Sequence, residues 1–366
     1  MKNKKLKVLV GMSGGVDSSV TAALLLAQGY EVIGAFMKNW SDAVDCDGEK
    51  KECGWKNERR DAMRVAAKLG IPFLTFDFEK EYRRDVIDHM FHEFEAGRTP
   101  NPDVWCNKYV KFDLFLKEAD KLGCDFIATG HYARIEKVEG DEGAEGVAGS
   151  YKIFAGSDSN KDQTYFLWAI PPEVLPRVLF PIGDMLKPDV RKKAHEFDLP
   201  VADKKDSTGI CFVGEVNIRD FLQQRIPKKP GQIVTTTGKV VGSHEGLPFY
   251  TIGQREGLNI GGGTPYYVVA KKPATNELVV SSNFEQALFA DSLEADSCNW
   301  FNQPKTLPFE CECRIRYRQP LVKCIIEETK KDTVKISFKE PQRAVTSGQS
   351  VVFYAGEEMI GGGIIV

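Results

Sequence analysis

The stretch Lys7-Val-Leu-Val-Gly-Met-Ser-Gly-Gly-Val-Asp-Ser-Ser19 places an apolar run, a glycine-rich turn and the start of a helical pattern in direct succession. The apolar run predicts a buried strand, and residues Ser18–Gln28 predict a helix that ends at Gly29. Gly14 and Gly15 allow positive φ and let backbone N–H groups approach an anion closely. The loop serines add hydroxyl donors at the positive end of the helix dipole. This order of elements predicts a phosphate site.

The same loop leaves the role of its acidic residue open. A two-glycine turn often only caps a helix, but here strand, loop and helix follow in the order that a phosphate site requires. Asp17 beside phosphates indicates either Mg²⁺ binding or a role in loop geometry. No Lys-Ser or Lys-Thr pair follows, so this is not the P-loop that handles a γ-phosphate. Residues Ser13–Ser19 resemble the ATP-pyrophosphatase (PP-loop) superfamily, which implies that ATP is split between its α- and β-phosphates to activate a substrate oxygen.

Strands and helices alternate through the first part of the chain. Alternation of this kind implies a parallel sheet covered by helices on both faces. The predicted elements are strands at 31–37, 73–78 and 125–129, and helices at 58–69, 79–95, 108–122 and 188–197.

Strand patterns dominate the remainder. Hairpin strands are predicted at 133–138 and 151–155, on either side of an acidic tip at 140–150. From Gly231 onward, short β-branched runs replace helical periodicity. We therefore expect an α/β protein with three parts: a PP-loop domain of the adenine nucleotide α-hydrolase-like type over residues 1–215, a small mixed domain over 216–282, and a β-barrel-like domain over 283–366.

Charge and composition limit the partners. The chain has 366 residues and a formal net charge of −3, so a nucleic acid must be held by local patches rather than by a global basic field. Residues 299–343 carry ten Lys or Arg against six Asp or Glu. This excess suits either a solvated β face or a phosphate-binding face. The alternation of Arg314, Arg316 and Arg318 predicts three guanidiniums on one side of a strand, which favours phosphate contact.

The cysteines and the apolar runs indicate the cellular compartment in which the protein is expected. Nine scattered cysteines do not form the pattern of a disulfide scaffold, which indicates a reducing compartment. No run approaches the ~20 apolar residues of a membrane span, and the basic N-terminus lacks a cleavage site. We expect a cytoplasmic protein without a membrane partner. The sequence predicts no oligomeric state.

Two cysteines stand in polar surroundings. Cys106 lies in a predicted loop just before a helix and beside Lys108, which predicts a lowered thiol pKa. Asp103, three residues earlier, could move a proton. Cys211 lies in a Gly/Asp/Ser-rich loop.

The other cysteines favour packing. Burial in apolar surroundings is expected for Cys124, Cys298 and Cys324, and ordinary packing for the alternating pair at 311 and 313. The pair at 46 and 53 supplies half a zinc ligand set with no histidine nearby. No metal site is therefore predicted from side chains.

With these segments in view, the chain resembles the bacterial tRNA 2-thiouridylase family over nearly its whole length. The matching segments are Gly11–Ser18, Asn101–Asp103 with Cys106, Thr129–Arg134, Lys161–Leu167, Asp206–Phe212, Gly246–Arg255, Arg316–Gln319 and Gly361–Ile365.

The resemblance implies a role for each matching residue. Residues Asn101, Pro102 and Asp103 would meet the target base, Cys211 would carry sulfur as a persulfide, and Cys106 would be its partner thiol. The residues implied to contact tRNA are Lys161, Asp162, Gln163, Arg316 and Tyr317. Those implied to bind ATP are Gly11, Met12, Ser13, Gly14, Gly15, Val16, Asp17, Ser18, Met37 and Gly130.

The implied reaction is ATP-dependent sulfur transfer to C2 of the wobble uridine (position 34) of tRNA. Adenylation of the uracil O2 makes a good leaving group, and the persulfide on Cys211 then delivers sulfur. Attack by Cys106 on the sulfur–sulfur bond would leave a disulfide that a reductant reopens. ATP, Mg²⁺, tRNA and a persulfide-donating sulfur-carrier protein are the implied cofactors and partners.

Three alternatives remain at this point. An adenylating ligase would leave both cysteines without a role. An iron–sulfur cluster held by Asp103, Cys106 and Cys211 would replace the persulfide, although the chain has no Cys-x-x-Cys. A non-catalytic RNA-binding module would leave the phosphate loop unexplained.

Overall fold

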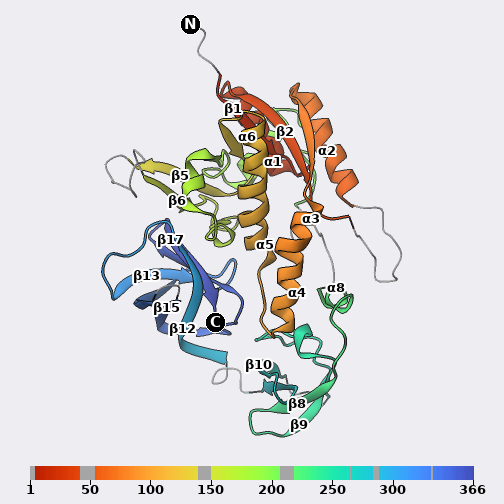
Figure 1. The fold of residues 1–366 in the computed structure, drawn as a ribbon, viewed down its shortest axis with the longest axis vertical. Helices are drawn as coiled ribbons and strands as arrows, with labels where there is room; N and C mark the ends of the chain where they lie inside the picture. The colour runs from red at the N-terminus through yellow and green to blue at the C-terminus, as the bar shows by residue number, and fades with distance from the viewer. Residues whose placement is uncertain are drawn as a thin grey trace.

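A computed structural model describes residues 5–41, 54–138, 150–206, 218–261, 263, 265–282, 288–330 and 333–366 (Figure 1). Cys46, Cys53 and Cys211 lie outside these described residues, as does most of the acidic tip at 140–150. None of the described helices is both long enough and apolar enough to span a bilayer.

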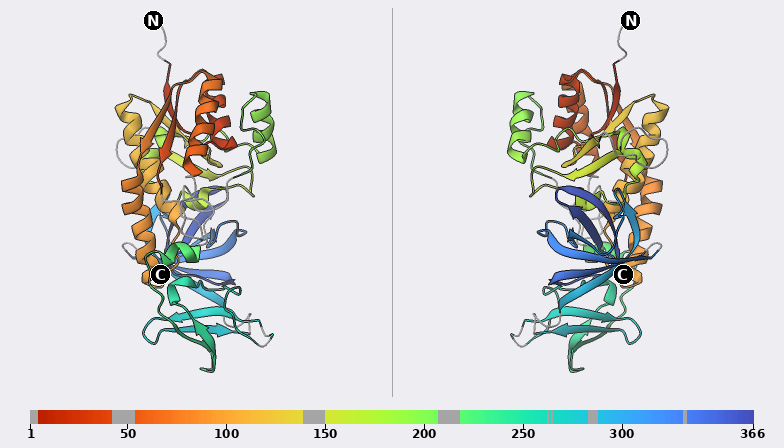
Figure 2. Two further views of the ribbon diagram at one scale, coloured as in Figure 1. Left: turned by 90° about the vertical axis from the view of Figure 1, so that its right-hand side faces the viewer. Right: turned by 90° about the vertical axis from the view of Figure 1, so that its left-hand side faces the viewer.

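A parallel sheet forms the first layer of the molecule. Its strand order is β3-β2-β1-β4-β7, and every pairing in it is parallel. Helices lie on both faces (Figures 1 and 2), which confirms the α/β prediction. The strands are β1 (Lys7–Gly11), β2 (Glu31–Lys38), β3 (Phe73–Asp77), β4 (Phe126–Ala128) and β7 (Val178–Leu179). Three helices of this part of the chain are α1 (Val16–Ala27), α2 (Gly54–Leu69) and α7 (Lys187–Glu196).

Two longer helical segments contain π-helical turns. Helix α3 (Glu79–Tyr82) runs through a π-helical turn into α4 (Asp88–Glu95). Helix α5 (Pro102–Trp105) continues through the π-helical residues Cys106–Leu114 into α6 (Phe115–Lys121). The widened turn is a local irregularity often found at functional sites.

A small β unit follows helix α8 (Ile218–Gln223) at the far end of the molecule from the parallel sheet (Figure 1). Its strand order is β10-β11-β8-β9. The strands are β8 (Gly231–Thr235), β9 (Val240–His244), β10 (Tyr267–Lys272) and β11 (Glu277–Ser281).

The last part of the chain is a closed antiparallel barrel. The order β12-β15-β14-β13-β16-β17 is closed by pairing of β12 with β17, so the ring has no free edge. The strands are β12 (Phe289–Trp300), β13 (Phe309–Arg314), β14 (Val322–Lys330), β15 (Thr333–Arg343), β16 (Ser350–Ala355) and β17 (Glu358–Ile365).

The predicted hairpin joins this barrel rather than the parallel sheet. Strand β5 (Ala133–Val138) pairs with β6 (Ser150–Ala155), and β6 pairs with β17 through Met359 and Ile153. Polar bonds strengthen the same junction, because Trp168 Nε1 donates to Ser350 Oγ at 2.9 Å. Backbone pairing therefore fixes the barrel to the hairpin that follows the parallel sheet.

The structure corrects the prediction of three arginines on one face of a strand. Strand β13 ends at Arg314, and the chain then turns, with Arg318 at a φ of 62°. Arg314 forms a buried ion pair with Asp162, Arg316 donates to backbone carbonyls, and Arg318 lies over the ring of Tyr317. The turn separates side chains that strict strand alternation would have aligned.

Candidate active site around the phosphate loop

The phosphate loop connects the buried strand β1 to the first turn of α1. Gly14 has a φ of 78°, and a Cβ there would lie 2.2 Å from the carbonyl oxygen of Glu58 in α2, so a larger residue does not fit. Ser18 Oγ accepts from the backbone N–H of Ser13 at 3.1 Å, which holds the loop in shape. Gly15, the residue at the start of α1, supplies no capping side chain. The first backbone N–H groups of α1 therefore suit an anion.

The residues predicted to bind ATP converge at the carboxyl ends of neighbouring parallel strands. Met37 is the penultimate residue of β2 and lies beside Gly11 at the end of β1. Gly130 follows β4 and comes so close to α1 that a Cβ there would lie 2.7 Å from the backbone nitrogen of Ser18. Met12 and Val16 are nearly fully buried beneath the loop. Such an edge is where open α/β sheets bind their ligands.

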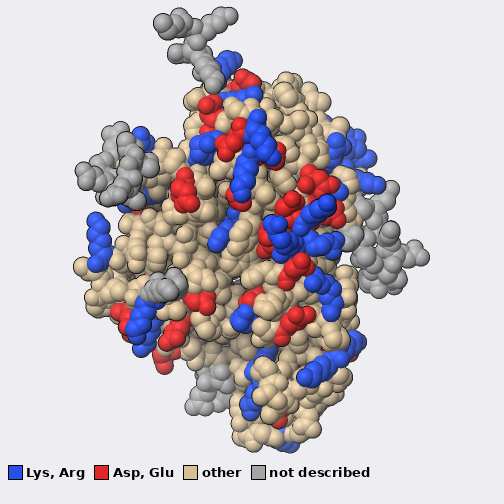
Figure 3. All heavy atoms as spheres, viewed as in Figure 1, with Lys and Arg blue, Asp and Glu red and all other residues tan. Residues whose placement is uncertain are grey.

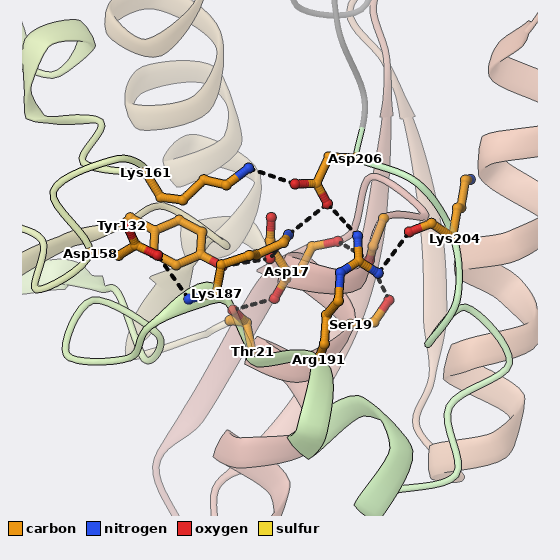
Figure 4. A network of polar contacts seen from close by, with 12 residues as sticks. Asp17, Ser19, Thr21, Tyr132, Asp158, Lys161, Lys187, Arg191, Lys204 and Asp206 are labelled. Atoms are coloured by element: carbon orange, nitrogen blue, oxygen red, sulfur yellow. Dashed lines mark hydrogen bonds and ion pairs between the residues drawn. The ribbon is translucent and has the colours of Figure 1, made fainter. Parts of the chain in front are cut away.

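An ion pair fixes the carboxylate of Asp17. Its Oδ1 accepts from Lys187 Nζ at 2.7 Å and from the Tyr132 hydroxyl at 2.9 Å (Figure 4). Burial, and then the neighbouring carboxylate of Asp17, raise the pKa of Tyr132, so its hydroxyl stays protonated and donates. The carboxylate of Asp17 therefore ties the start of α1 to Lys187 and Tyr132, and both of these bonds are made by its Oδ1 atom.

A second carboxylate, Asp206, lies at the same place. It accepts from Lys161 Nζ at 2.6 Å, Lys187 Nζ at 2.9 Å and Arg191 Nη2 at 2.7 Å (Figure 4). Burial opposes ionisation here, but the hydrogen bonds from Lys161 and Lys187 prevail and lower the pKa of Asp206 to about 2. Asp206 is the last described residue before the segment that carries Cys211.

Sequence reasoning missed several residues of this network. Lys204 Nζ donates to the carbonyl oxygen of Gly14 at 3.0 Å and pairs with Asp61 at 2.8 Å. Lys187 and Arg191 come from α7, an ordinary amphipathic helix in the sequence. Lys204 stands next to Lys205, but a pair of lysines does not by itself indicate a contact with the phosphate loop. The contacts of α7 depend on the tertiary fold.

The surroundings of Cys106 differ from the prediction. Helix α5 begins at Pro102, where Asn101 Oδ1 accepts from the backbone N–H of Asp103 at 3.2 Å, so Cys106 lies inside the helix and not in a loop before it. Its side chain is 0% exposed within the main apolar cluster. Burial lowers the pKa of the neighbouring Lys108, whose ammonium lies over the ring of Trp105. The expectation of a polar loop around Cys106 was therefore wrong, while its catalytic role stays a prediction.

The segment Lys161–Gln163, which was predicted to contact tRNA, directs most of its polar side chains toward the protein interior. Asp162 is 2% exposed and accepts from the backbone N–H of Gly156 and from the guanidinium of Arg314. Gln163 Oε1 accepts from the backbone N–H of Tyr132 at 3.0 Å. Lys161, which is partly exposed, is the member of the three that points into the ionic network. Two of these three residues thus shape the site from within.

Arg316 and Tyr317 lie where three parts of the chain meet. Arg316 Nη2 donates to the carbonyl oxygen of Ala344 at 2.9 Å and, more weakly, to that of Ile252 in the small β unit at 3.4 Å. The ring of Tyr317 packs 4.5 Å from that of Phe166. On the face seen in Figure 3, basic and acidic side chains are interspersed, so no broad basic patch covers the part of it drawn in colour.

Known proteins match the whole chain. Family models described as a tRNA methyl transferase HUP domain, a tRNA methyl transferase PRC-barrel domain and an aminomethyltransferase β-barrel domain match residues 6–215, 219–282 and 290–365. A tRNA-specific 2-thiouridylase MnmA of Shouchella clausii is 46% identical over 100% of this chain and 97% of its own length. The chain belongs to the tRNA-specific 2-thiouridylase family. A second family member, from Geobacillus kaustophilus, is 48% identical over 98% of this chain and 94% of its own.

Solved structures outside the 2-thiouridylase family are similar only in part. A 4-thiouridine synthetase–RNA complex with bound ATP covers 60% of this chain and 50% of its own, with 18% identity and a TM-score of 0.36. A similarity of this size carries no functional conclusion.

Proposed function

We propose that this protein is a tRNA-uridine 2-sulfurtransferase that uses ATP to exchange the C2 oxygen of the wobble uridine for sulfur, giving 2-thiouridine, AMP and pyrophosphate. The observation that carries the proposal is family membership over the full length, joined to a phosphate loop built at the carboxyl edge of the sheet. We assign residues 1–215 to catalysis, 216–282 to a small linking domain and 283–366 to a barrel that contacts tRNA. Because its substrates would be ATP and tRNA, we assign it to the cytoplasm.

The loop is suited to ATP because it combines backbone donors with nearby cations. The start of α1 offers N–H groups, and Lys187 lies beside it. Asp17 lies in the first turn of α1, directly after the loop, and is partly exposed. Mg²⁺ commonly binds one or two carboxylates together with phosphate oxygens and water, so Asp17 alone is a sufficient protein ligand. The ion would neutralise phosphate charge, while Asp17 keeps its bond to Tyr132.

The two cysteines divide the sulfur chemistry. The uracil O2 attacks the α-phosphorus of ATP, and pyrophosphate leaves. A sulfur-carrier protein loads Cys211 with a persulfide, whose terminal sulfur attacks C2. Cys106 then attacks the inner sulfur, so that the S–S bond breaks, AMP leaves with the former O2, and a Cys106–Cys211 disulfide forms. Asp103 would move the proton, and a reductant would restore both thiols.

Recognition of tRNA is proposed at two places. Asn101, Pro102 and Asp103 form the first turn of α5 and would meet the base. Lys161, Arg316 and Tyr317 would contact the backbone, with Asp162 and Gln163 acting by positioning, because their polar atoms are bonded within the protein.

Mass spectrometry of tRNA nucleosides tests the function. The full chain is incubated with unmodified tRNA, ATP and a persulfide donor, and 2-thiouridine is expected only when all three are present. Formation of a methylated nucleoside instead, or release of AMP without any modified nucleoside, would contradict the proposal. Activity of protein freed of iron by chelation separates the persulfide route from a cluster.

A further inference from the structure

The carboxylate of Asp206 is surrounded by basic groups from separate parts of the fold. Lys187 and Arg191 lie one turn apart on α7, and Lys161 comes from the loop that follows β6. All three point at this single carboxylate from different directions (Figure 4). Lys187 is only 11% exposed and also contacts Asp17.

Three cations converge on the single carboxylate of Asp206, and one of them, Lys187, also contacts Asp17. Asp158 accepts from the backbone N–H of Lys187, and the start of α1 adds its own positive end. Without Asp206, Lys161 and Arg191 would lose the carboxylate that they share with Lys187. A polyphosphate presents more negative charge than a carboxylate, and its oxygens accept the same N–H donors.

We propose that the phosphates of ATP and the carboxylate of Asp206 compete for Lys161, Lys187 and Arg191, so that Asp206 is a tethered anion which nucleotide displaces. The inference rests on the proposed function in one respect, namely that ATP binds at the phosphate loop. Binding of ATP and release of Asp206 are then a single linked equilibrium. Lys161, Lys187 and Arg191 become phosphate-binding residues in addition to the loop itself.

Competition predicts that removal of the Asp206 charge tightens ATP binding. The test is calorimetric titration of the full chain with ATP and Mg²⁺ in the absence of tRNA. Asp206→Asn should lower Kd by roughly tenfold, because a partly exposed set of ion pairs no longer has to be broken. Asp203→Asn is the matched control, since its side chain is 93% exposed and lies three residues away; its Kd should equal that of the wild type.

A double-mutant cycle separates competition from a supporting role. In the wild type, Lys161→Gln weakens both the bond to Asp206 and the bond to phosphate, so its effect on Kd is partly cancelled. In the Asp206→Asn background only the phosphate bond is lost, so the effect should be larger by about threefold or more. Asp206→Ser serves as a second variant if the asparagine variant misfolds in thermal unfolding.

The outcomes are distinct. An unchanged or weaker ATP affinity in folded Asp206 variants would overturn the competition and leave sulfur transfer intact. Equal effects of Lys161→Gln in both backgrounds would also overturn it. Failure of the wild type to bind ATP would overturn the proposed function, and the inference with it.

Discussion

Lys187 Nζ lies 2.7 Å from Asp17 Oδ1, although 170 positions separate the two residues in the sequence. The contact joins the beginning of α7 to the first turn of α1. The phosphate loop therefore does not depend on its own residues alone, because Lys187, which is distant in the sequence, holds the carboxylate of Asp17 in position.

The first prediction concerns Asp17. Asp17→Ala should abolish tRNA-dependent pyrophosphate release from a folded protein, because both the ion pair with Lys187 and the acceptor for Tyr132 are lost. Tyr132→Phe removes only the hydroxyl donor and should reduce the rate by a few-fold, on the order of a single hydrogen bond. Pyrophosphate release is followed by a coupled assay, and a normal rate in Asp17→Ala would exclude this role.

The second prediction separates two functions of Arg316. Arg316→Ala should flatten the log–log salt dependence of tRNA binding by about one unit, as expected for one lost phosphate contact. It should also lower the thermal midpoint, because Arg316 holds the carbonyl of Ala344. Arg316→Lys keeps the positive charge but lacks the planar guanidinium. Relative to Arg316→Ala, it should therefore restore the salt dependence of tRNA binding more fully than the thermal stability. A wild-type salt dependence in Arg316→Ala would show that Arg316 makes no contact with a tRNA phosphate.

The third prediction follows from the burial of Cys106. Its fully buried side chain should resist alkylation by iodoacetamide in the free protein. Addition of tRNA should increase the rate if the thiol is to reach Cys211, since a disulfide needs Cα atoms within roughly 7 Å. Cys106→Ser should accept a persulfide at Cys211 but fail to turn over. Repeated turnover by Cys106→Ser would refute the two-thiol mechanism.

The fourth prediction concerns a different pair of thiols. Cys311 and Cys324 lie directly opposite each other on β13 and β14, with their sulfur atoms 3.5 Å apart. Hydrogen peroxide should join them in a disulfide, but slowly at neutral pH, because the hydrogen bond to Cys324 and burial raise the pKa of Cys311. Peptide mapping should find this bridge after oxidation, and Cys311→Ser should lack it without loss of thiolation. Rapid formation of the Cys311–Cys324 disulfide at neutral pH would contradict a raised thiol pKa of Cys311.

The fifth prediction is a pH dependence of stability. Burial lowers the pKa of Lys271 to about 8, while its ammonium donates to the carbonyl of Gly97 at 3.1 Å. Between that pKa and the ordinary value of 10.5 the unfolded chain binds more protons than the folded one, so stability rises with pH. Relative to Lys271→Met, the wild type should gain on the order of 2 kcal/mol in unfolding free energy across this window. Urea titrations at several pH values measure the difference, and a parallel pH response of both proteins would contradict it.

Much of the fold follows from local pattern. The strand at 7–11, the helix from Ser18 and the alternation that follows were confirmed, because apolar periodicity and helix-ending glycines act over short distances. At Gly29, for example, φ is 91° and α1 ends as predicted. The predicted hairpin at 133–138 was also confirmed, but its partner strand β17 lies far along the chain, and no local pattern specifies such a pairing.

The site was predicted less completely. Glycines and serines of the loop carry a recognisable signal, whereas Lys187 has the same appearance as any surface lysine on an amphipathic helix. Cys106 was expected in a loop, because α5 begins at Pro102, whereas the helical periodicity in the sequence predicted a start only at Lys108, nearly two turns later. The turn after Arg314 was missed because alternating residues look the same whether or not a strand continues.

The bond between β6 and β17 also sets an order of events during synthesis. The hairpin leaves the ribosome long before its partner, since Ile153 pairs with Met359. At typical translation rates the outer edge of β6 would stay open for on the order of ten seconds or more. An open strand edge invites association with other chains. The nascent protein therefore passes through an interval in which this edge needs shielding, and loss of the final strand would make that exposure permanent.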